Sequence, residues 1–352
     1  MCYYIIMSET RSEDKNKIDF LAIGDTVIDA FIKLSKAEII GEPDTPGYEI
    51  AIPFAEKVEY EDVFVIPAVG NAANAAISAA RLGLNTAIVT NLGEDRDGED
   101  CMAEFKKNSV KTDFVKINPG HKTNYHYVLW YGAERTILIK HENYEYSLPD
   151  VGSPKWIYFS SVNEKAFPFH YKIADYLEAH PEINFAFQPG KFEIKLGYEK
   201  MERFYKRAQM FFCNVEEAEK ILDMESIGER HRNPKDLIKG LLQRIHDLGP
   251  KTVVITDGPN GAYAYDGKDF LFLPIYPDPK PPYSRTGAGD AFSSTTVAAT
   301  ALGKGLPEAL AWAGINSMAV VQKVGANVGL LSQEKIAEYL KNAPENYKAT
   351  KI

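Results

Sequence analysis

Short runs of β-forming hydrophobic residues alternate with helix-patterned segments along most of the chain. The strand-like runs are IDFLAIGD, TAIVTNLG, WIYFSS, INFAFQP, QMFFCN and KTVVITDG, and segments such as NAANAAISAARLG and HYKIADYLEAH stand between them. A hairpin-like GAYAYDGKDFLFLP and helices after Gly289 complete the pattern. This alternation predicts an α/β fold with a doubly wound, mostly parallel sheet that is flanked by helices on both faces.

Two segments, residues 31–68 and about 112–140, break the alternation because they hold many β-formers and few helix signals. Both follow core strands, so we expect them to pair into a small β-sheet at one end of the main domain. Ligands of open α/β sheets bind outside the carboxyl ends of the strands, so a sheet there would act as a lid. The alternatives are a decorative insertion or a dimer contact.

The composition is that of a globular protein, with 45% hydrophobic and 25% charged residues among 352. We expect one domain over residues 18–345. The opening CYYIIM is short, lacks a basic flank and leads into a polar stretch, so residues 1–17 are interpreted as a disordered tail and not as a signal peptide. No apolar run reaches the roughly 18 residues that span a bilayer.

The net charge and the cysteine content indicate which partners the protein would bind and in which compartment it would be found. The net charge of −9 argues against nucleic acid and anionic membranes as partners. Cys2, Cys101 and Cys213 form no closely spaced pair, which argues against a disulfide framework and a cysteine-rich zinc site. Reduced thiols in a cytoplasmic protein are the simplest interpretation.

The stretch from Arg285 to Phe292 reads Arg-Thr-Gly-Ala-Gly-Asp-Ala-Phe and runs into a small-residue helical segment. A glycine-rich turn at a helix N-terminus exposes backbone N–H groups to an anion, and Gly287, Ala288 and Gly289 occupy this turn. Asp290 follows in the first helical turn. A carboxylate base beside an anion cradle suits phosphoryl transfer to a hydroxyl. A helix-capping acid after a glycine turn explains the same residues equally well.

Acidic and amide residues accompany two earlier predicted elements. Asp25 and Asp29 stand at the end of the first strand, where carboxylates accept hydrogen bonds from vicinal hydroxyls of a sugar, although Asp25 also fits a turn cap. The Ala-rich helix opens at Gly70, and most of its alanines are expected in the core. Asn71 is a candidate N-cap, and Asn74 lies one turn further, where it would reach a ligand hydroxyl.

Further motifs fit a nucleotide site and also fit ordinary structural roles. Asn214 and Glu217 have the spacing of a capping box, or alternatively order the waters around a phosphate-bound Mg²⁺. The Thr256–Gly261 loop allows a nucleotide to approach the backbone, yet it also fits a simple turn. Gly325-Ala326 follows an apolar helix and is uninformative alone. The chain has no P-loop, dinucleotide fingerprint, H-E-x-x-H helix or G-x-S-x-G elbow, which removes several enzyme classes.

Together and in this order, the motifs resemble the ribokinase-like, or PfkB, family of carbohydrate and nucleoside kinases over about residues 18–340. The most specific element is Thr286-Gly287-Ala288-Gly289-Asp290. Support comes from Asn214-x-x-Glu217, Gly93-x-Asp95-x-x-Gly98, the helix start at Gly70 to Asn74, and Gly24 to Asp29. The resemblance implies a ribokinase-like fold and an ATP-dependent phosphotransferase that moves the γ-phosphate to a sugar hydroxyl, with Mg²⁺ as cofactor.

The resemblance also implies roles for single residues. Asp290 would be the catalytic base, and Gly287, Ala288 and Gly289 would form the anion hole. Arg135, in the expected lid, would approach the transferring phosphate or an anionic substrate, or would be an ordinary strand arginine. The substrate-binding candidates are Asp29, Asn74, Asp25, Gly70 and Asn71. The nucleotide-binding candidates are Asn214, Glu217 (on the metal through water), Thr256, Gly258, Gly261, Gly325 and Ala326.

The chain departs from the family pattern at two places. The last motif often opens with an acid that helps to place a monovalent cation, and this chain has Ser284-Arg285-Thr286 there, so K⁺ activation is an open question. The paired glycine of the second motif is reduced to Val69-Gly70, and a valine would crowd the sugar pocket and change which substrate fits.

Two other functions compete with a sugar kinase. A nucleoside kinase of the same family would use lid aromatics (Tyr125, Tyr127, Trp130 and Tyr131) to stack on a base, although these side chains could equally pack the lid against the core or a second subunit. A ligand-binding or regulatory protein without turnover, or a nucleotide-binding scaffold, would not need Asp290. Exposed lid edges also make a homodimer through the lid a reasonable expectation.

Overall fold

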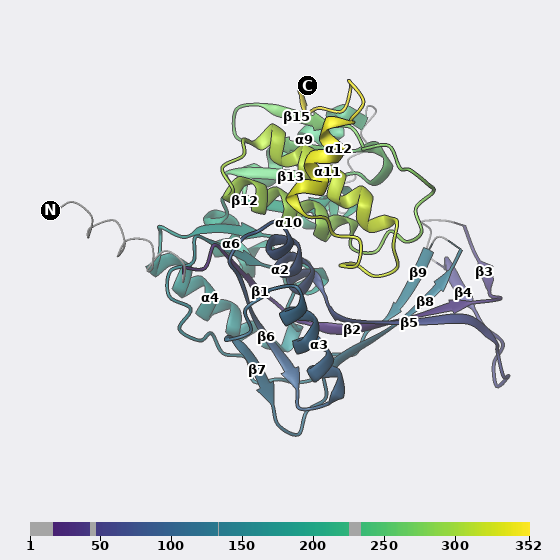
Figure 1. Ribbon diagram of the computed structural model, residues 1–352. Coiled ribbons are helices and arrows are strands. Elements are labelled where there is room, and N and C mark those ends of the chain that lie inside the picture. Colours follow the sequence, from purple (N-terminus) through teal and green to yellow (C-terminus); the bar gives the residue numbers. More distant parts are fainter. Residues whose placement is uncertain (1–16, 43–46, 133, 225–233) are drawn as a thin grey trace, which may run out of the picture.

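The computed structural model describes residues 17–42, 47–132, 134–224 and 234–352. All but the last residue of the expected disordered tail, 1–17, therefore lie outside the described residues. Within these ranges, a 10-stranded sheet has the order β16-β15-β14-β13-β12-β11-β10-β1-β6-β7 (Figure 1). The strands from β7 to β13 run parallel, and β14, β15 and β16 continue the sheet antiparallel. The predicted mostly parallel sheet is confirmed.

The strands of this main sheet are β1 (Phe20–Ile23), β6 (Thr86–Gly93), β7 (Val115–Asn118), β10 (Trp156–Phe159), β11 (Asn184–Phe187), β12 (Met210–Asn214), β13 (Thr252–Thr256), β14 (Ala262–Tyr265), β15 (Phe270–Leu273) and β16 (Thr350–Lys351). One face is covered by α2 (Asn71–Arg81), α3 (Arg96–Lys107), α10 (Ala288–Ala301), α11 (Leu306–Val321) and α12 (Gln333–Lys341). The other is covered by α4 (Phe167–Ala179), α5 (Lys191–Leu196), α6 (Tyr198–Arg207), α7 (Val215–Ile221) and α9 (Pro234–Asp247).

Side-chain alternation along the strands builds a separate core on each face. In β1, Phe20 and Ala22 belong to the core beneath α2 and α10, whereas Leu21 and Ile23 belong to the core beneath α4. Both sets are fully buried, because helices cover both faces of the sheet. This arrangement explains the uninterrupted hydrophobic runs in the sequence.

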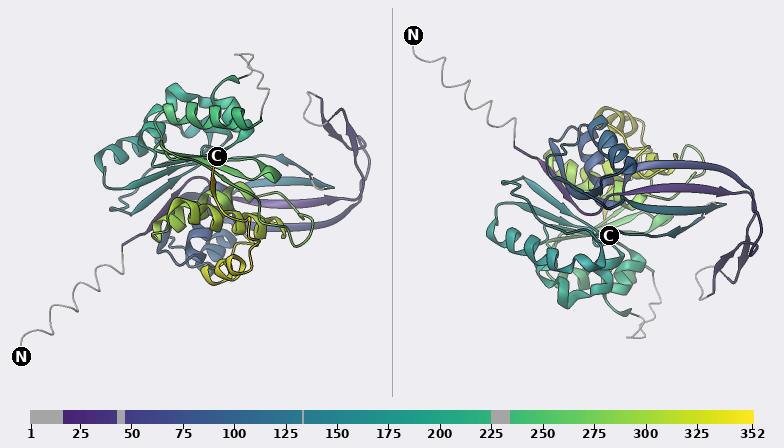
Figure 2. Two further views of the ribbon diagram at one scale, coloured as in Figure 1. Left: turned by 90° about the horizontal axis from the view of Figure 1, so that it is seen from above. Right: turned by 90° about the horizontal axis from the view of Figure 1, so that it is seen from below.

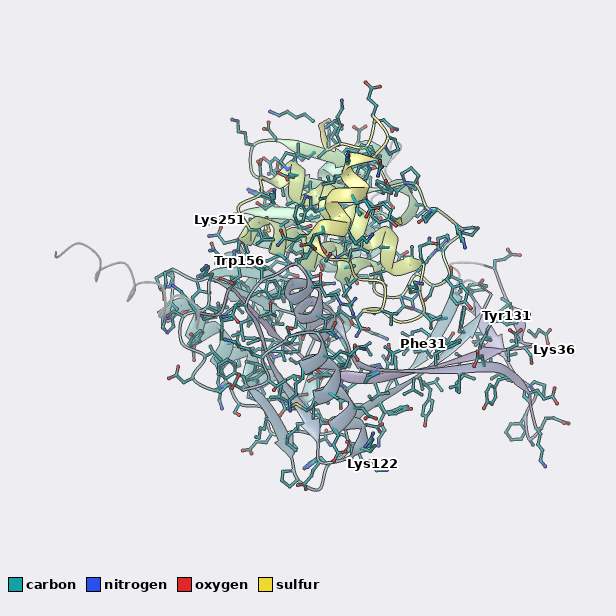
Figure 3. The ribbon with its side chains drawn as sticks, in the orientation of Figure 1. Phe31, Lys36, Lys122, Tyr131, Trp156 and Lys251 are labelled. Carbon is teal, nitrogen blue, oxygen red and sulfur yellow. The ribbon has the colours of Figure 1, made fainter. Side chains whose placement is uncertain are left out.

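A second, four-stranded sheet, here called the small sheet, projects from one side of the body (Figures 1 and 2). It contains β2 (Val27–Leu34), β5 (Tyr60–Val69), β8 (Asn124–Tyr131) and β9 (Glu134–Leu138) in the order β5-β2-β8-β9. Strands β2 and β8 pair parallel, and the other pairs are antiparallel. Phe31 lies near the body, while Tyr131 and Lys36 lie toward the outer end (Figure 3). A hairpin of β3 (Glu38–Ile40) and β4 (Glu49–Ala51) adjoins that end.

The predicted small sheet is present, but its boundaries differ from the expected 31–68 and 112–140. Strand β2 begins at Val27, so Asp29 stands inside the small sheet and not at the end of β1. Residues 115–118 form β7 and pair with β6 of the main sheet. The β-rich composition of both segments did not reveal which sheet each strand would join, since that depends on its partners.

The start of α2 also differs from expectation. Gly70, not Asn71, is the N-cap, with φ of 102°. A Cβ at Gly70 would stand 2.8 Å from the backbone oxygen of Asp25. This close approach, together with a φ that favours glycine, explains why the helix begins one residue earlier than the side-chain rule for N-caps predicts.

Within the described ranges, none of the helices combines the length and the apolar character that crossing a bilayer would require.

Candidate functional site

A cavity of about 790 Å³ lies where the small sheet meets the carboxyl ends of the parallel strands, a size typical of small-molecule sites. Fifteen of the candidate residues line it. They are Asp29, Gly70, Asn71, Asn74, Arg135, Asn214, Glu217, Thr256, Gly258, Gly261, Gly287, Ala288, Gly289, Asp290 and Ala326. The fold thus brings together residues from the N-terminal third, the middle and the end of the chain.

Asp290 lies in the first turn of α10, and side-chain amides hold both of its carboxylate oxygens. Asn74 Nδ2 donates to Oδ2 at 2.7 Å, and Gln188 Nε2 donates to Oδ1 at 3.0 Å. Burial raises the pKa of Asp290 above the ordinary value, although both amide donors oppose that shift. The carboxylate is therefore a stronger base than an exposed aspartate, and its orientation is fixed.

Gln188 is a site residue that the sequence reasoning missed. Its amide oxygen accepts hydrogen bonds from the Tyr158 hydroxyl and from Ser293 Oγ, the latter at 2.8 Å. Because the oxygen is occupied, the amide nitrogen faces Asp290. Gln188 directly follows β11, so the rule that ligands bind at the carboxyl ends of parallel strands would have found it in the run INFAFQP.

The N-terminus of α10 is open toward the cavity. Gly287 is the N-cap in the left-handed region, with φ of 82°, and no side chain caps the helix. Ala326 packs against this turn so closely that a Cβ on Gly287 would lie 2.5 Å from the Ala326 Cβ. The Ala288 N–H makes one long hydrogen bond, to the Arg285 carbonyl oxygen at 3.4 Å. The backbone N–H groups at a helix N-terminus and the helix dipole favour an anion at this end.

Asn214 and Glu217 form the predicted capping box at the start of α7. The Glu217 N–H donates to Asn214 Oδ1 at 2.8 Å, and the Asn214 N–H donates to Glu217 Oε2 at 2.9 Å. Burial raises the pKa of Glu217, and the negative charge of Asp290 adds to the shift. Across the described part of the chain, no group of three or more His, Cys, Asp or Glu side chains is arranged to hold a metal by itself.

The small sheet presents one face to the cavity, with Asp29, His126 and Arg135. Three buried polar atoms at this end have no hydrogen-bond partner, namely Asp29 Oδ1, Asn74 Oδ1 and Arg135 Nε. Burial lowers the pKa of Arg135, whereas the charges of Glu134, Asp29 and Asp290 oppose that shift. Unsatisfied buried donors and acceptors are costly, so their concentration here marks a place for a polar ligand.

Two candidate residues, Asp25 and Gly325, lie outside the cavity lining. The Asp25 carboxylate accepts hydrogen bonds from the Tyr146 hydroxyl at 2.7 Å, the Asn163 N–H at 2.9 Å and His141 Nδ1 at 3.1 Å. Its oxygens therefore serve structural contacts. Gly325, with φ of 98°, packs near Ile66 and is adjacent to the lining residue Ala326.

The lid aromatics do not line the cavity either. Trp130 packs edge-on against Tyr283 with ring centroids 5.1 Å apart, and Tyr125 contacts Tyr127 at 5.1 Å. These contacts match the packing alternative and give no support to base stacking. Ser284, at the position of the family acid, bonds through Oγ to Thr286 Oγ1 at 3.0 Å.

Two cysteines and one further motif have structural roles. Cys101 and Cys213 are free and buried, and Cys2 lies outside the described residues. Asp95, in the Gly93-x-Asp95-x-x-Gly98 motif, caps α3 through the Gly98 N–H at 2.9 Å. It also accepts hydrogen bonds from the N–H and Oγ1 of Thr123, which precedes β8. This motif therefore anchors the small sheet to the main body.

Comparisons with known proteins agree with this geometry. The sequence profile of "pfkB family carbohydrate kinase" matches residues 38–333. A ribokinase of Bacillus subtilis is 24% identical over 278 residues, which are 77% of this chain and 87% of that protein. A nucleoside kinase of Methanothermobacter thermautotrophicus is 25% identical over 294 residues, 80% of this chain and 81% of that protein.

Among solved structures, the ribokinase of Cryptococcus neoformans in complex with ADP superposes with a TM-score of 0.73 at 21% identity. That alignment covers 92% of this chain and 99% of the ribokinase, so the two share the ribokinase-like fold. The family profile spans most of the chain and includes nearly all of the residues that line the cavity. The chain therefore belongs to the pfkB family of carbohydrate kinases.

Proposed function

We propose that this protein is an ATP-dependent kinase that transfers the γ-phosphate to a hydroxyl of a sugar. The observation that carries the proposal is Asp290, a half-buried carboxylate that two side-chain amides hold beside the open N-terminus of α10. A base next to a set of backbone donors is what in-line attack of a hydroxyl on a phosphoryl group requires.

Each side of the site has its own task in this proposal. Asp290 accepts the proton of the attacking hydroxyl. The N–H groups at Gly287, Ala288 and Gly289 stabilise charge on the transferring phosphoryl group. Thr256, Gly258 and Gly261 line the nucleotide side, as do the apolar side chains of Tyr276, Met318 and Val321, which offer a surface for a purine.

The residues present also fit magnesium. Mg²⁺ binds through one or two carboxylates, substrate phosphates and several waters, so it does not need a dedicated protein cage. Glu217 is a half-buried carboxylate on the cavity wall, and its raised pKa indicates an environment in which a bound cation would stabilise the ionised form. When bound, Mg²⁺ would neutralise part of the phosphate charge. A K⁺ site has no such support, because Ser284 replaces the family acid.

The acceptor side favours a polyol over a nucleoside. Asp29, Asn71 and Asn74 offer hydrogen bonds to hydroxyls, and none of the four lid aromatics lines the cavity. Arg135, with a buried Nε that lacks a partner, adds a positive charge that interacts with both Asp29 and Asp290. That charge suits the transferring phosphate, or the carboxylate or phosphate of an acidic sugar.

We further propose that the small sheet acts as a lid and as a dimer contact in the cytoplasm. The end of β8 and the start of β9 already contact the loop before α10, through Trp130 on Tyr283 and through Arg285 Nη1, 3.3 Å from Glu134 Oε1. On the face that turns away from the cavity, Val65, Tyr127 and Leu138 are 52%, 49% and 51% exposed. Register places Val65 beside Ala30, Ala30 beside Tyr127, and Tyr127 beside Leu138, so the exposed side chains lie on one face of the sheet, on either side of the buried Ala30. A dimer mass by light scattering would support the dimer contact, and a monomer mass would exclude that contact.

The function is tested by ADP release from Mg-ATP over a panel of pentoses, hexoses, sugar acids and nucleosides. Release that depends on a sugar and is lost in Asp290→Asn is the expected result. Release only with nucleosides would overturn the choice of acceptor. If ATP binds and no acceptor works, the non-catalytic alternative gains support; if ATP does not bind, the nucleotide assignment is wrong.

A further inference from the structure

Ala68 has a backbone conformation that residues with a Cβ rarely adopt. Its φ of 54° lies in the left-handed region, and its side chain is fully buried. It stands near the end of β5, where the register with β2 shifts between Val27 and Asp29. A left-handed φ is unfavourable for an L residue, so it persists only where other contacts impose it, and such positions gather at functional sites.

Two hydrogen bonds from distant parts of the chain hold Ala68. Its N–H donates to Cys101 Sγ of α3 at 3.2 Å, and Asn327 Nδ2 donates to its carbonyl oxygen at 3.0 Å. These partners lie 33 and 259 positions away in the sequence. Asn327 is itself buried, with 2% of its surface exposed. Both polar backbone groups of Ala68 are therefore occupied by contacts that only the folded chain provides.

The loop that carries Asn327 also supports the anion-binding turn of α10. Ala326, the preceding residue, is so close to Gly287 that a Cβ on Gly287 would lie 2.5 Å from the Ala326 Cβ. Arg81, the last residue of α2, donates through Nη1 to the Asn327 carbonyl oxygen at 2.9 Å. The loop is therefore fixed to the end of α2 by Arg81 and to the segment before α2 through Ala68.

Helix α2 carries one of the two amides that hold the base. It begins after the N-cap Gly70, two residues beyond Ala68, and its Asn74 donates to Asp290 Oδ2 at 2.7 Å. The direction in which the chain leaves Ala68 therefore determines where α2 begins and where Asn74 lies. Asn327 is not among the residues that line the cavity, so its effect on the site passes through Ala68.

We infer that Asn327 is a positioning residue, whose amide imposes the left-handed conformation of Ala68 and so aligns α2 and Asn74 with Asp290. The inference rests on the proposed kinase function, since it assigns Asp290 to phosphoryl transfer. Without the amide donor, the Ala68 carbonyl oxygen loses its partner, and Ala68 returns toward an ordinary φ. The contact that orients the base then loosens, and a displacement of about 1 Å lowers the rate by about 100-fold.

The first variant removes the donor and keeps a side chain of similar size. Asn327→Leu should lower kcat by about 10- to 100-fold, because the base is misplaced. The KM for ATP should stay within about twofold of the native value, because the residues that bind ATP are unchanged. Asn327→Ala, which adds no bulk, gives the same comparison if leucine prevents folding.

The second variant tests whether the effect passes through Ala68. Ala68→Gly alone should keep kcat within about twofold of the native value, because glycine occupies the left-handed region without steric cost. Combined with Asn327→Leu, it should return kcat to within about fivefold of native, since glycine can hold this conformation without the amide. Failure of Ala68→Gly to restore kcat would overturn the inference.

Asn118→Leu is the matched control. Asn118 is also a buried amide that donates to a backbone carbonyl oxygen, that of Leu92 at 3.0 Å, but it lies on β7 at the edge of the main sheet and outside the cavity lining. We expect a lower melting temperature with native kcat. An equal loss of kcat in Asn118→Leu and Asn327→Leu would show that Asn327 contributes only to general stability.

Melting temperatures of the native protein, both single variants and the double variant give a readout that needs no turnover. With Asn327 present, Ala68 is held in its strained conformation, and Ala68→Gly removes the strain. In Asn327→Leu the strain is already relaxed, so the same change should be less favourable there. Equal shifts in both backgrounds would overturn the inference. Absence of acceptor-dependent ADP release in the native enzyme would instead count against the proposed function.

Discussion

Asn74 and Asp290 are 216 positions apart in the sequence, yet the Asn74 amide donates to the Asp290 carboxylate at 2.7 Å. The contact joins the first turns of α2 and α10, which pack against each other on one face of the main sheet. Gln188, from the carboxyl end of β11, holds the second oxygen. The site is therefore assembled by three elements whose positions depend on the whole sheet.

Replacement of Asp290 by Asn should abolish most activity and stabilise the protein. Loss of a general base costs about 10²–10⁴-fold in kcat. Burial of the Asp290 charge is unfavourable in the free protein, as its raised pKa indicates. Asn74 can turn its amide to bond the new side chain, because its Oδ1 has no partner to lose. We expect a higher melting temperature by calorimetry, and a lower one would contradict this account.

The raised pKa of Asp290 also sets the pH dependence. Only the ionised carboxylate accepts a proton, so kcat/KM should fall with acid at a pH above that expected for an exposed aspartate. The contribution of Asp290 to the free energy of unfolding changes with pH in the opposite direction to the activity, because the pKa of Asp290 is higher in the folded than in the unfolded state. Its contribution is complete below the unfolded pKa and is lost as pH rises through the folded pKa. The melting temperature of the native protein relative to Asp290→Asn should therefore decrease across that window.

Gln188→Glu should move the acidic limb of the activity profile to higher pH. The substitution replaces an amide donor at 3.0 Å from Asp290 Oδ1 with a second carboxyl group. A like charge at that distance disfavours ionisation, and a shift of about one pH unit or more is expected. Activity at high pH should recover in part. An unchanged limb would show that Gln188 does not act on Asp290.

Gly287→Ala should destabilise the protein, whereas Gly289→Ala should not. A Cβ at residue 287 would require a φ of 82° and would lie 2.5 Å from Ala326, whereas a Cβ at residue 289 meets no atom within 4 Å. We expect a loss of about 1–3 kcal/mol or more from the first change and no loss from the second, which places alanine in a helix. Urea unfolding of both variants makes the comparison.

Glu217→Gln should weaken the response to magnesium and leave the fold intact. The glutamine oxygen can still accept the Asn214 N–H, which preserves the capping box. Loss of the carboxylate should raise the Mg²⁺ concentration for half-maximal activity by about tenfold or more. Asn214→Ala is the companion variant, because it removes the cap that Glu217 N–H uses and should lower stability by about 1 kcal/mol. An unchanged Mg²⁺ response in Glu217→Gln would remove this residue from the metal site.

Much of the fold follows from local sequence signals. The helices at Asn71–Arg81 and Tyr198–Arg207 and the strands at Trp156–Phe159 and Thr252–Thr256 lie where hydrophobic periodicity predicts them. The glycine turn before α10 and the capping box of Asn214 and Glu217 also depend on residues close in sequence. Such features can be predicted from the sequence because the interactions that stabilise them join residues within about one helical turn or one strand.

The chain by itself therefore determined the α/β alternation, the glycine-rich motif that ends at Asp290, and fifteen of the residues around the cavity. Only the tertiary structure decided that the Asp25 carboxylate accepts hydrogen bonds from Tyr146, Asn163 and His141. It also decided that Asp29 belongs to the small sheet. It also decided that Gln188 and His126 enter the site. These contacts join residues far apart in sequence, so their geometry depends on strand order and register, which local patterns do not encode.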